Sequence, residues 1–263
     1  MHRVAIKIAY DGSAFHGQVR QPGLRTVEGE VIHALRSARI LRDPKEARFQ
    51  SASRTDRGVS ALGNVVAFDT SLAPDAAARA LNAKSRGVWA WAAAGVLADF
   101  NARRARSRWY RYALPPTHSV DALDAVLRLF EGEHDVRNFT RDRAGTRIRI
   151  DLARAAKEDD HVAIDFQAQS FRWNLVRRIV AAALRVESGD ASASDIEAAL
   201  AKPARVDFGL APPEPLTLID VEYDERFETL RDPTTAQRVV ETLAGVRRNA
   251  DFLARLHGKF ADI

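Results

Sequence analysis

The sequence predicts an α+β fold, and three observations about its segments support this prediction. Strand-like and helix-like segments alternate along the 263 residues. Several strand-like segments are apolar on one side and polar on the other, as in sheets that carry helices on a single face. A doubly wound parallel sheet would show more continuous apolar runs than this chain contains. An α+β layout is therefore expected.

Apolar periodicity defines the segments in the first half of the chain. Expected there are a strand at 4–10, a helix at 26–38, a strand at 64–68, a helix at 74–83 and a strand at 109–114. The first strand is expected to be half buried, because Ile8 lies on one face and Lys7 on the other. A Pro-Pro pair then interrupts the chain and marks a boundary between two domains, 1–114 and 115–263.

The second half repeats this mixture of strands and helices. We expect strands at 147–152, 162–168 and 217–223. We also expect three helices: one at 175–186, a second that ends at residue 200, and a third from 234 to about 256. Ser194 and Glu197 have the spacing of a capping box, which would start the helix that runs to residue 200. Thr234 and Gln237 have the same spacing at the start of the last helix. The apolar residues of that helix form one stripe, which contains Val239, Leu243 and Val246.

The composition excludes several classes of protein. Without cysteine, the chain has no disulfide, no thiol nucleophile, no cysteine-based zinc site and no iron–sulfur cluster. Its start, MHRVAIKIAYDG, lacks the apolar centre of a signal peptide. No run reaches the roughly 18 apolar residues that a membrane span needs. The protein is therefore expected to be soluble and cytoplasmic, with no membrane partner.

The net charge of +5 and the excess of arginine over lysine fit two explanations. A GC-rich genome favours arginine codons, whereas a nucleic-acid-binding protein uses the guanidinium group to pair with phosphates. Two stretches without acidic residues, 100–120 and 170–185, favour RNA binding. In the first, arginines alternate with Trp109, Tyr110 and Tyr112, which places phosphate contacts beside stacking platforms for bases. The alternative is a solvated basic strand edge that discourages aggregation.

Asp56 is the candidate catalytic residue. It lies in a small polar loop, residues 51–63, that leads into the strand at 64–68, and it is flanked by Arg54 and Arg57. From these residues alone, a loop aspartate that forms an Asx-turn is the simpler explanation. A chemical role for the carboxylate needs further support from the rest of the chain.

That support is a resemblance of the loop to the active-site loop of TruA-type pseudouridine synthases, whose pattern is close to G-R-T-D-x-G-V-H-A. The matching residues are Arg54, Thr55, Asp56, Gly58, Val59 and Ala61, and the departures are Ser53 and Ser60. Other segments along the chain also resemble the family pattern, and all of the matches occur in the order found in the family. These segments are Tyr10-Asp11-Gly12, Phe100 to Arg103, Arg108 to Tyr112, Gly132 to Asp135, Phe171 with Val176 to Val180, and Ala211 to Glu214. Gln18-Val19 stands where Trp-Gln is usual, and Pro215 where Gly is usual. The resemblance ends near residue 223.

The resemblance implies isomerisation of uridine to pseudouridine in the anticodon stem-loop of tRNA. Asp56 would be the catalytic carboxylate, acting at C1′, at C6 or on a 2′ proton. Arg177 would pair with this carboxylate as a second catalytic residue. Tyr110 would stack on the target base, and Arg54 would contact the RNA near the flipped nucleotide. The reaction involves no redox change, so no cofactor and no metal would be needed.

The family fold is a pair of RRM-like α/β subdomains whose mostly antiparallel sheets join into a larger sheet, with the catalytic cleft between them. A homodimer that binds tRNA across both subunits is also implied. Two alternatives stay open: a synthase that acts on another RNA or tRNA position, and a non-catalytic RNA-binding protein on the same scaffold. A zinc-dependent deaminase lacks support because its ligand motif is missing, and a methyltransferase because no G-x-G-x-x-G loop follows a strand.

Overall fold

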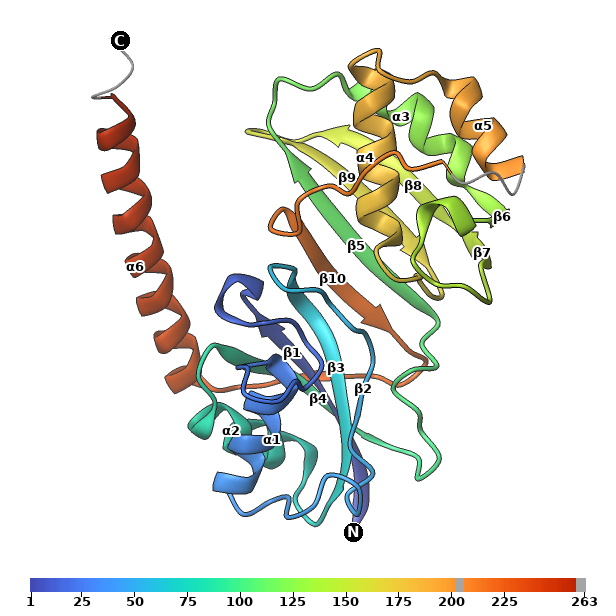
Figure 1. Ribbon diagram of the computed structural model, residues 1–263. Helices are drawn as coiled ribbons and strands as arrows, with labels where there is room; N and C mark the ends of the chain where they lie inside the picture. Colours follow the sequence, from blue (N-terminus) through green and yellow to red (C-terminus); the bar gives the residue numbers. More distant parts are fainter. Residues whose placement is uncertain (202–205, 259–263) are drawn as a thin grey trace.

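One long sheet organises the molecule (Figure 1). The computed structural model describes the backbone of residues 1–201 and 206–258, with side chains described up to residue 246. The strands are β1 (His2–Tyr10), β2 (Gln50–Ser51), β3 (Ser60–Thr70), β4 (Val88–Val96), β5 (Ser107–Leu114), β6 (Gly132–Asp135), β7 (Arg147–Ile150), β8 (Leu152–Lys157), β9 (Val162–Ala168), β10 (Leu216–Glu222) and β11 (Glu228–Thr229). The α-helices are α1 (Val27–Ser37), α2 (Pro74–Lys84), α3 (Val120–Leu127), α4 (Leu175–Glu187), α5 (Ala193–Ala201) and α6 (Pro233–Gly258).

The strand order in the sheet is β11-β4-β1-β3-β10-β5-β9-β8, and β2 also pairs with β3. Within the described chain, all of these neighbours run antiparallel except β3 and β10, which run parallel. Strands β6 and β7 form a separate antiparallel pair. The predicted α+β class is therefore confirmed, with one large and mostly antiparallel sheet.

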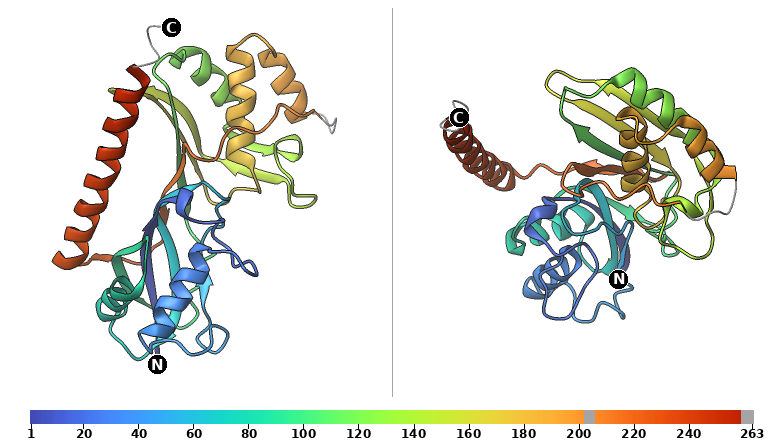
Figure 2. Two further views of the ribbon diagram at one scale, coloured as in Figure 1. Left: turned by 60° about the vertical axis from the view of Figure 1, so that its left-hand side comes forward. Right: turned by 45° about the horizontal axis from the view of Figure 1, so that its top comes forward.

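The helices lie in two groups along the sheet (Figure 1). Helices α1 and α2 pack against the strands of the N-terminal end, whereas α3, α4 and α5 lie at the end formed by β5, β9 and β8. Buried residues from both groups belong to one continuous hydrophobic core. Figure 2 shows that α6 leaves the body of the molecule after its first turns. None of the helices that the structure describes is long and apolar enough to cross a membrane.

Strand β1 is buried on both faces, so the prediction of a half-buried strand is wrong. Ile8 is inaccessible on one face, and on the other face Arg3 and Lys7 are 2% and 8% exposed. Irregular segments cover this second face. Arg3 donates a hydrogen bond to the carbonyl oxygen of Phe100 at 2.8 Å, and the Lys7 ammonium lies 5.3 Å from the ring centroid of Phe227. These segments have no periodicity of their own, so the pattern of β1 alone could not indicate their cover.

Most other elements agree with the periodicity. In β5, Tyr112 and Leu114 are buried on the predicted face, while their neighbours are partly exposed. The predicted helices at 26–38, 74–83 and 175–186 occur as α1, α2 and α4 with ends shifted by one residue at most. The strand expected at 147–152 is interrupted at Asp151, which separates β7 from β8. Side-chain alternation is thus a reliable guide to these elements, although it does not locate a break within a strand.

Two helices start about two residues earlier than their predicted capping boxes. The hydroxyl of Ser192 accepts the backbone N–H of Asp195, whose carboxylate accepts the backbone N–H of Ser192 at 2.8 Å. This reciprocal pair caps α5 in place of Ser194. In the same way, Asp232 rather than Thr234 caps α6 and accepts a backbone N–H at 3.0 Å. Closely spaced serine, threonine and aspartate residues offer several caps, and tertiary packing selects among them.

Strand β4 and helix α3 were not predicted from the sequence. β4 is rich in alanine, which has a low preference for strands. It is nevertheless held on both sides by β1 and β11. α3 spans only two turns and begins with Ser119, whose hydroxyl accepts the backbone N–H of Ala122 at 3.3 Å. Tertiary pairing therefore decides the structure where local preference is weak.

The two ends of the sheet meet where β10 lies beside β3. This parallel pair is short and aligns Thr217 with Ser60. Gly63 allows the close approach, because a Cβ atom there would lie 2.4 Å from a carboxylate oxygen of Asp220. Lys7 of β1 donates to both carboxylate oxygens of Asp220 in β10, at 2.5 and 2.7 Å. This ion pair spans β3, which lies between β1 and β10 in the sheet. The largely buried Lys7–Asp220 pair therefore reinforces the junction.

Replacing Lys7 with methionine is expected to lower the free energy of unfolding by about 1–3 kcal/mol, because the carboxylate of Asp220 would stay partly buried without its partner. Urea denaturation measures this loss. The matched control is Arg106→Met, which removes the ion pair with Asp224, whose two side chains are 69% and 82% exposed. No measurable change is expected for the control, and equal effects of the two variants would contradict a special role for the junction.

Candidate active site

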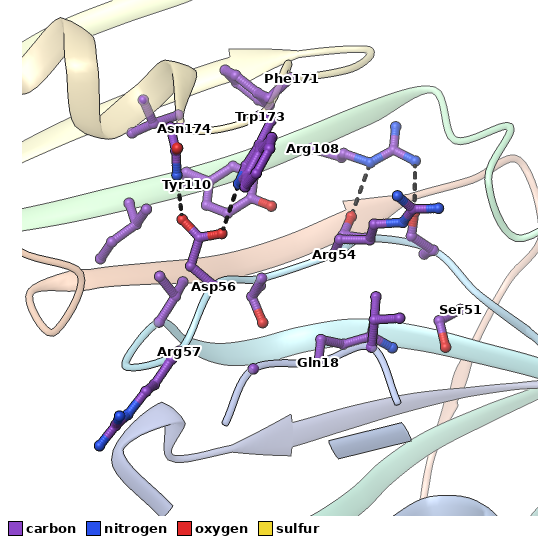
Figure 3. Close-up of a pocket in the computed structure, with 18 of the residues that line it drawn as sticks. Gln18, Ser51, Arg54, Asp56, Arg57, Arg108, Tyr110, Phe171, Trp173 and Asn174 are labelled. Atoms are coloured by element: carbon purple, nitrogen blue, oxygen red, sulfur yellow. Dashed lines mark hydrogen bonds between the residues drawn. The ribbon is translucent and has the colours of Figure 1, made fainter. Parts of the chain in front are cut away.

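A cleft of about 1090 Å³ opens beside the junction of the two ends of the sheet. Most of its lining comes from four parts of the chain: the turn after β1, the loop between β2 and β3, the start of β5, and the segment between β9 and the first turn of α4. Arg103, Asp142 and Leu216 also line it. Asp56, Arg54, Tyr110 and Arg177 all line this cleft. Figure 3 shows how the loop that carries Asp56 faces the segment that carries Trp173 and Asn174.

The carboxylate of Asp56 is held by three donors from the start of α4. Trp173 donates its indole N–H to Oδ1 at 3.2 Å, and Asn174 donates its amide to Oδ2 at 2.6 Å (Figure 3). Arg177 donates from Nη1 to Oδ2 at 2.9 Å, and its Nε donates to the carbonyl oxygen of Ala211 at 2.8 Å. This second bond fixes the guanidinium plane, so the charged hydrogen bond to Asp56 has a defined direction.

The ion pair between Asp56 and Arg177 is only partly removed from water. The side chain of Arg177 is 12% exposed, while that of Asp56 remains 30% exposed toward the cleft. The backbone of Asn174 has φ = +63°, a left-handed conformation that asparagine tolerates better than most residues. This conformation at the helix start turns the amide toward Asp56. The carboxylate is thus fixed in position and still accessible to a molecule in the cleft.

The loop that carries Asp56 is clamped by buried polar groups. Asn64 of β3 is fully buried and brackets Ser53: its oxygen accepts the Ser53 N–H at 3.2 Å, and its amide donates to the Ser53 carbonyl at 3.0 Å. The same amide donates to the hydroxyl of Tyr10, which also bonds Thr55 at 2.9 Å. Burial raises the pKa of Tyr10 to about 12, so its hydroxyl keeps its proton near neutral pH.

Gly12 explains why the turn after β1 resembles the family pattern. A Cβ atom at Gly12 would lie 2.3 Å from the backbone carbonyl of Val59, so no residue with a side chain fits at this position. The N–H of Gly12 donates to the hydroxyl of Ser60 at 3.1 Å. The turn therefore packs directly against the end of the Asp56 loop and limits its movement.

Arg108 of β5 lines the cleft and reaches the segment of this loop near Arg54 (Figure 3). It is 7% exposed and donates to the Ser53 hydroxyl at 2.9 Å, to the Ala52 carbonyl at 3.1 Å and to the Arg103 carbonyl at 3.0 Å. A further bond reaches the carbonyl of Gln169. All of these acceptors are uncharged, and no carboxylate pairs with Arg108 in the part of the chain that the structure describes. Its positive charge therefore remains available to the cleft.

Tyr110 combines a packing role with a position at the cleft. It is 7% exposed, shares the buried face of β5 with Tyr112, and packs edge-on against Phe171 with ring centroids 5.2 Å apart. Burial raises the pKa of the Tyr110 hydroxyl, which therefore stays protonated near neutral pH. Arg54 is exposed at the cleft wall.

The sequence neighbours of Asp56 are not its hydrogen-bond partners. Trp173 and Asn174, which supply two of the three donors, were missed by sequence analysis, and so was the clamp from Arg108. The available signal was the acid-free stretch at 170–185, which contains both Trp173 and Asn174, but the only residue of that stretch expected to pair with Asp56 was Arg177. Among the described residues, no group of three or more histidine, aspartate or glutamate side chains is placed to hold a metal ion.

Comparison with known proteins gives consistent matches. A family model described as tRNA pseudouridine synthase matches residues 126–224. The chain is 38% identical over 250 residues to tRNA pseudouridine synthase A of Methanothermobacter thermautotrophicus, which covers 92% of this chain and 89% of the relative. It is 42% identical over 229 residues to tRNA pseudouridine synthase A of Thermococcus sibiricus (84% and 85% covered), and 39% identical over 268 residues to that of Methanococcoides burtonii (97% and 96% covered).

Among solved structures, a crystal structure of a Cbf5-Nop10-Gar1 complex matches 66% of this chain and 43% of that chain. The sequence identity of this match is 12% and its TM-score is 0.34.

The clamp on the Asp56 loop can be tested with two buried asparagines. Asn64→Ala is expected to lower the free energy of unfolding by about 2–3 kcal/mol, because it leaves the N–H and C=O of Ser53 unpaired. It should also speed hydrogen exchange at residues 52–56. The control is Asn82→Ala: Asn82 is also buried and brackets one residue, Ala90, with bonds of 2.7 and 2.9 Å.

A similar loss of stability is expected for the Asn82→Ala control, but exchange at residues 52–56 should stay as in the wild type. Hydrogen exchange followed by mass spectrometry distinguishes the two variants. Unchanged exchange in Asn64→Ala would show that the loop holds its conformation without this clamp.

Proposed function

The chain belongs to the tRNA pseudouridine synthase A family, and from this membership we propose that it converts uridines in the anticodon stem-loop of tRNA to pseudouridine, with Asp56 as the catalytic carboxylate. The single observation that carries the residue assignment is the fixed carboxylate in the cleft, which three donors hold while it stays 30% exposed.

The proposed reaction is an isomerisation, so the atoms of substrate and product balance without a co-reactant. The bond between N1 and C1′ breaks, the uracil rotates, and a bond between C5 and C1′ forms. C5 loses its proton and N1 gains one. Breaking a glycosidic bond builds positive charge at the sugar, which a carboxylate stabilises or captures. The oxygens of Asp56 supply this negative charge at a defined place.

The partners of Asp56 have distinct proposed roles. Arg177 is the only charged donor among the three, and we assign it a catalytic role in directing the carboxylate through a charged hydrogen bond. Trp173 and Asn174 restrict the rotation of the carboxylate about its side-chain torsion. Trp173 is 52% exposed, and the guanidinium of Arg141 lies 5.4 Å from its ring, so its indole also offers a stacking face at the entrance.

Tyr110 and Arg54 are proposed to bind the RNA. The ring of Tyr110 provides a flat surface beside the catalytic loop for the flipped uracil, and its protonated hydroxyl can donate a hydrogen bond. Arg54 is exposed at the cleft wall next to Asp56, where it can pair with the phosphate of the flipped nucleotide. Arg108, which lines the cleft and pairs with no carboxylate among the described residues, adds to this attraction for the RNA backbone.

We further propose that the chain divides into an N-terminal subdomain, residues 1–114, and a C-terminal subdomain, residues 115–263, each with an RRM-like arrangement of strands and helices. The two groups of helices and the short parallel contact between β3 and β10 support this division. The last strands return to the first subdomain, because β11 pairs with β4. The cleft would then lie between the subdomains.

A homodimer is proposed from the family resemblance and from helix α6. In the part of α6 whose side chains are described, up to residue 246, Arg238 near its start ties the helix to the body by donating to the carbonyls of Asn82 and Ser85. Beyond this point the helix carries four exposed apolar side chains along one side: Val239, Val240, Leu243 and Val246, which are 42%, 57%, 46% and 58% exposed. A second copy of the chain would remove this stripe from water.

Asp56→Asn is expected to reduce the conversion of uridine by at least about a thousandfold while tRNA affinity stays near that of the wild type. Asparagine has nearly the same shape, so the loop keeps its conformation, but the anionic oxygen is lost. Purified protein is incubated with a tRNA transcript, and pseudouridine is mapped along the whole transcript. The map also identifies the modified position, which separates the anticodon stem-loop from other sites.

The matched control is Asp142→Asn, since Asp142 is a second carboxylate that lines the cleft but has no contact with Asp56. Its activity should stay within about tenfold of the wild type, because its oxygen still accepts the backbone N–H of Trp173. Near-normal conversion by Asp56→Asn would contradict the catalytic assignment. Absence of pseudouridine with the wild type on every tRNA tested would contradict the proposed activity itself.

The proposed dimer predicts a mass in light scattering equal to twice that of one chain. Replacing both Leu243 and Val246 with glutamate is expected to give the mass of a single chain, because charge would be buried in the interface. Gln237→Glu, on the opposite side of α6, serves as the control and should remain dimeric. A wild-type mass equal to one chain at micromolar concentration would contradict this proposal.

A further inference from the structure

Buried polar atoms without a partner gather around the cleft. Among the described residues, six buried side-chain nitrogen and oxygen atoms have no hydrogen-bond partner within the protein. Five of the six belong to residues that line the cleft: His16 Nδ1, Gln18 Oε1 and Nε2, Ser51 Oγ and Arg172 Nε. An unpaired buried polar group is unfavourable for folding, and each one calls for a reason. Their concentration at a single cleft points to a ligand that supplies the missing partners.

Gln18 is the strongest case, because both atoms of its amide are unpaired. The residue is 1% exposed. Its backbone is fully engaged: the N–H donates to the carbonyl of Thr55 at 3.1 Å, and the carbonyl accepts the N–H of Glu28 at 2.9 Å. The backbone therefore fixes Gln18 between the catalytic loop and α1, while the amide itself contributes no bond to the fold. A leucine or methionine of similar size would fill the same space without this penalty.

The amide of Gln18 lies on the other side of the catalytic loop from the reacting carboxylate. Figure 3 shows the carboxylate of Asp56 directed toward Trp173 and Asn174, whereas Gln18 and Ser51 lie on the opposite side of the loop. A group bound at Gln18 is therefore not the uracil attached to the sugar at Asp56. A nucleotide next to the target in the same RNA could supply such a group.

The chemistry of an amide selects a nucleobase over a phosphate. Gln18 presents one donor beside one acceptor, and the hydroxyl of Ser51 can act as either. A phosphate only accepts hydrogen bonds, so it would leave the Gln18 oxygen unpaired. The edge of an unpaired base carries a donor next to an acceptor and matches an amide with two hydrogen bonds. The family pattern has a tryptophan at this position, so the amide is a departure of this chain from that pattern.

We propose that Gln18 and Ser51 form a base-recognition subsite, which reads the edge of an unpaired base adjacent to the target uridine. This inference rests on the proposed function in that RNA must enter the cleft. Because the amide is shielded from water in the free protein, the base displaces side chains of the cleft wall as it docks. Recognition at Gln18 is thus coupled to correct seating of the RNA on the catalytic loop.

The experiment combines Gln18→Leu with changes in the RNA. Leucine removes both hydrogen-bonding atoms and fills the space, so the melting temperature of the free protein should stay the same or rise. On tRNA, kcat/KM should fall about tenfold or more, as for the loss of a base contact with two hydrogen bonds. A set of transcripts is then tested in which single unpaired nucleotides beside the modified uridine lack their base.

Removal of the recognised base should cost the wild type about tenfold and should cost Gln18→Leu little, because the partner amide is already gone. The control is Gln21→Leu in the same turn, since the exposed amide of Gln21 already donates to the carbonyl of His16 at 2.8 Å. This control should show the same dependence on the missing base as the wild type. Gln18→Met, which is unbranched, replaces the leucine variant if the latter does not fold.

Two results would overturn the subsite. One is a Gln18→Leu protein that matches the wild type in kcat/KM on every transcript. The other is a fall in activity that is the same with and without each neighbouring base, which would indicate a purely structural role for Gln18. In both cases conversion by the wild type, measured in the same assay, still supports the proposed function, so the two hypotheses fail independently.

Discussion

The carboxylate of Asp56 joins parts of the chain that are far apart in sequence. It lies on the loop between β2 and β3, and all three of its donors come from the start of α4, more than a hundred residues later. A displacement of one part against the other would weaken these bonds together. Their geometry depends on a sheet that continues from β3 through β10 to β5. The short parallel pair, the close approach at Gly63 and the buried Lys7–Asp220 pair all serve that continuity.

Directional hydrogen bonds from buried side chains hold the shape of the loop that carries Asp56. Asn64 brackets the backbone of Ser53, and Arg108 binds the hydroxyl of Ser53 and the carbonyl of Ala52. A loop has no regular hydrogen-bond pattern, so buried side chains must supply the partners that a strand or helix would provide. As a result, the buried polar side chains near the cleft can form all their hydrogen bonds in only one conformation of the loop. The unpaired amide of Gln18 stands beside this network and takes no part in it.

Much of the fold and part of the site followed from the sequence. The α+β class, most helices and the face of β5 are visible in side-chain periodicity, and the resemblance of the loop drew attention to Asp56. The cover over the second face of β1 and the alanine-rich strand β4 were not predictable, because irregular segments and tertiary pairing determine them. Trp173 was missed for a related reason. Its importance comes from a contact across the cleft, and nothing in its own neighbourhood distinguishes it from an ordinary exposed aromatic residue.

The position of β10 has a consequence for the order in which the protein is made. β10 is formed by residues near the end of the chain, yet it occupies the middle of the sheet between β3 and β5. A ribosome delivers the N-terminal strands first, and long-range strand pairing is slow because distant segments must meet. Until residue 222 has emerged, β3 and β5 each present an unpaired edge toward the other. The cleft, whose lining includes Leu216 of β10, is therefore incomplete during most of the synthesis of the chain.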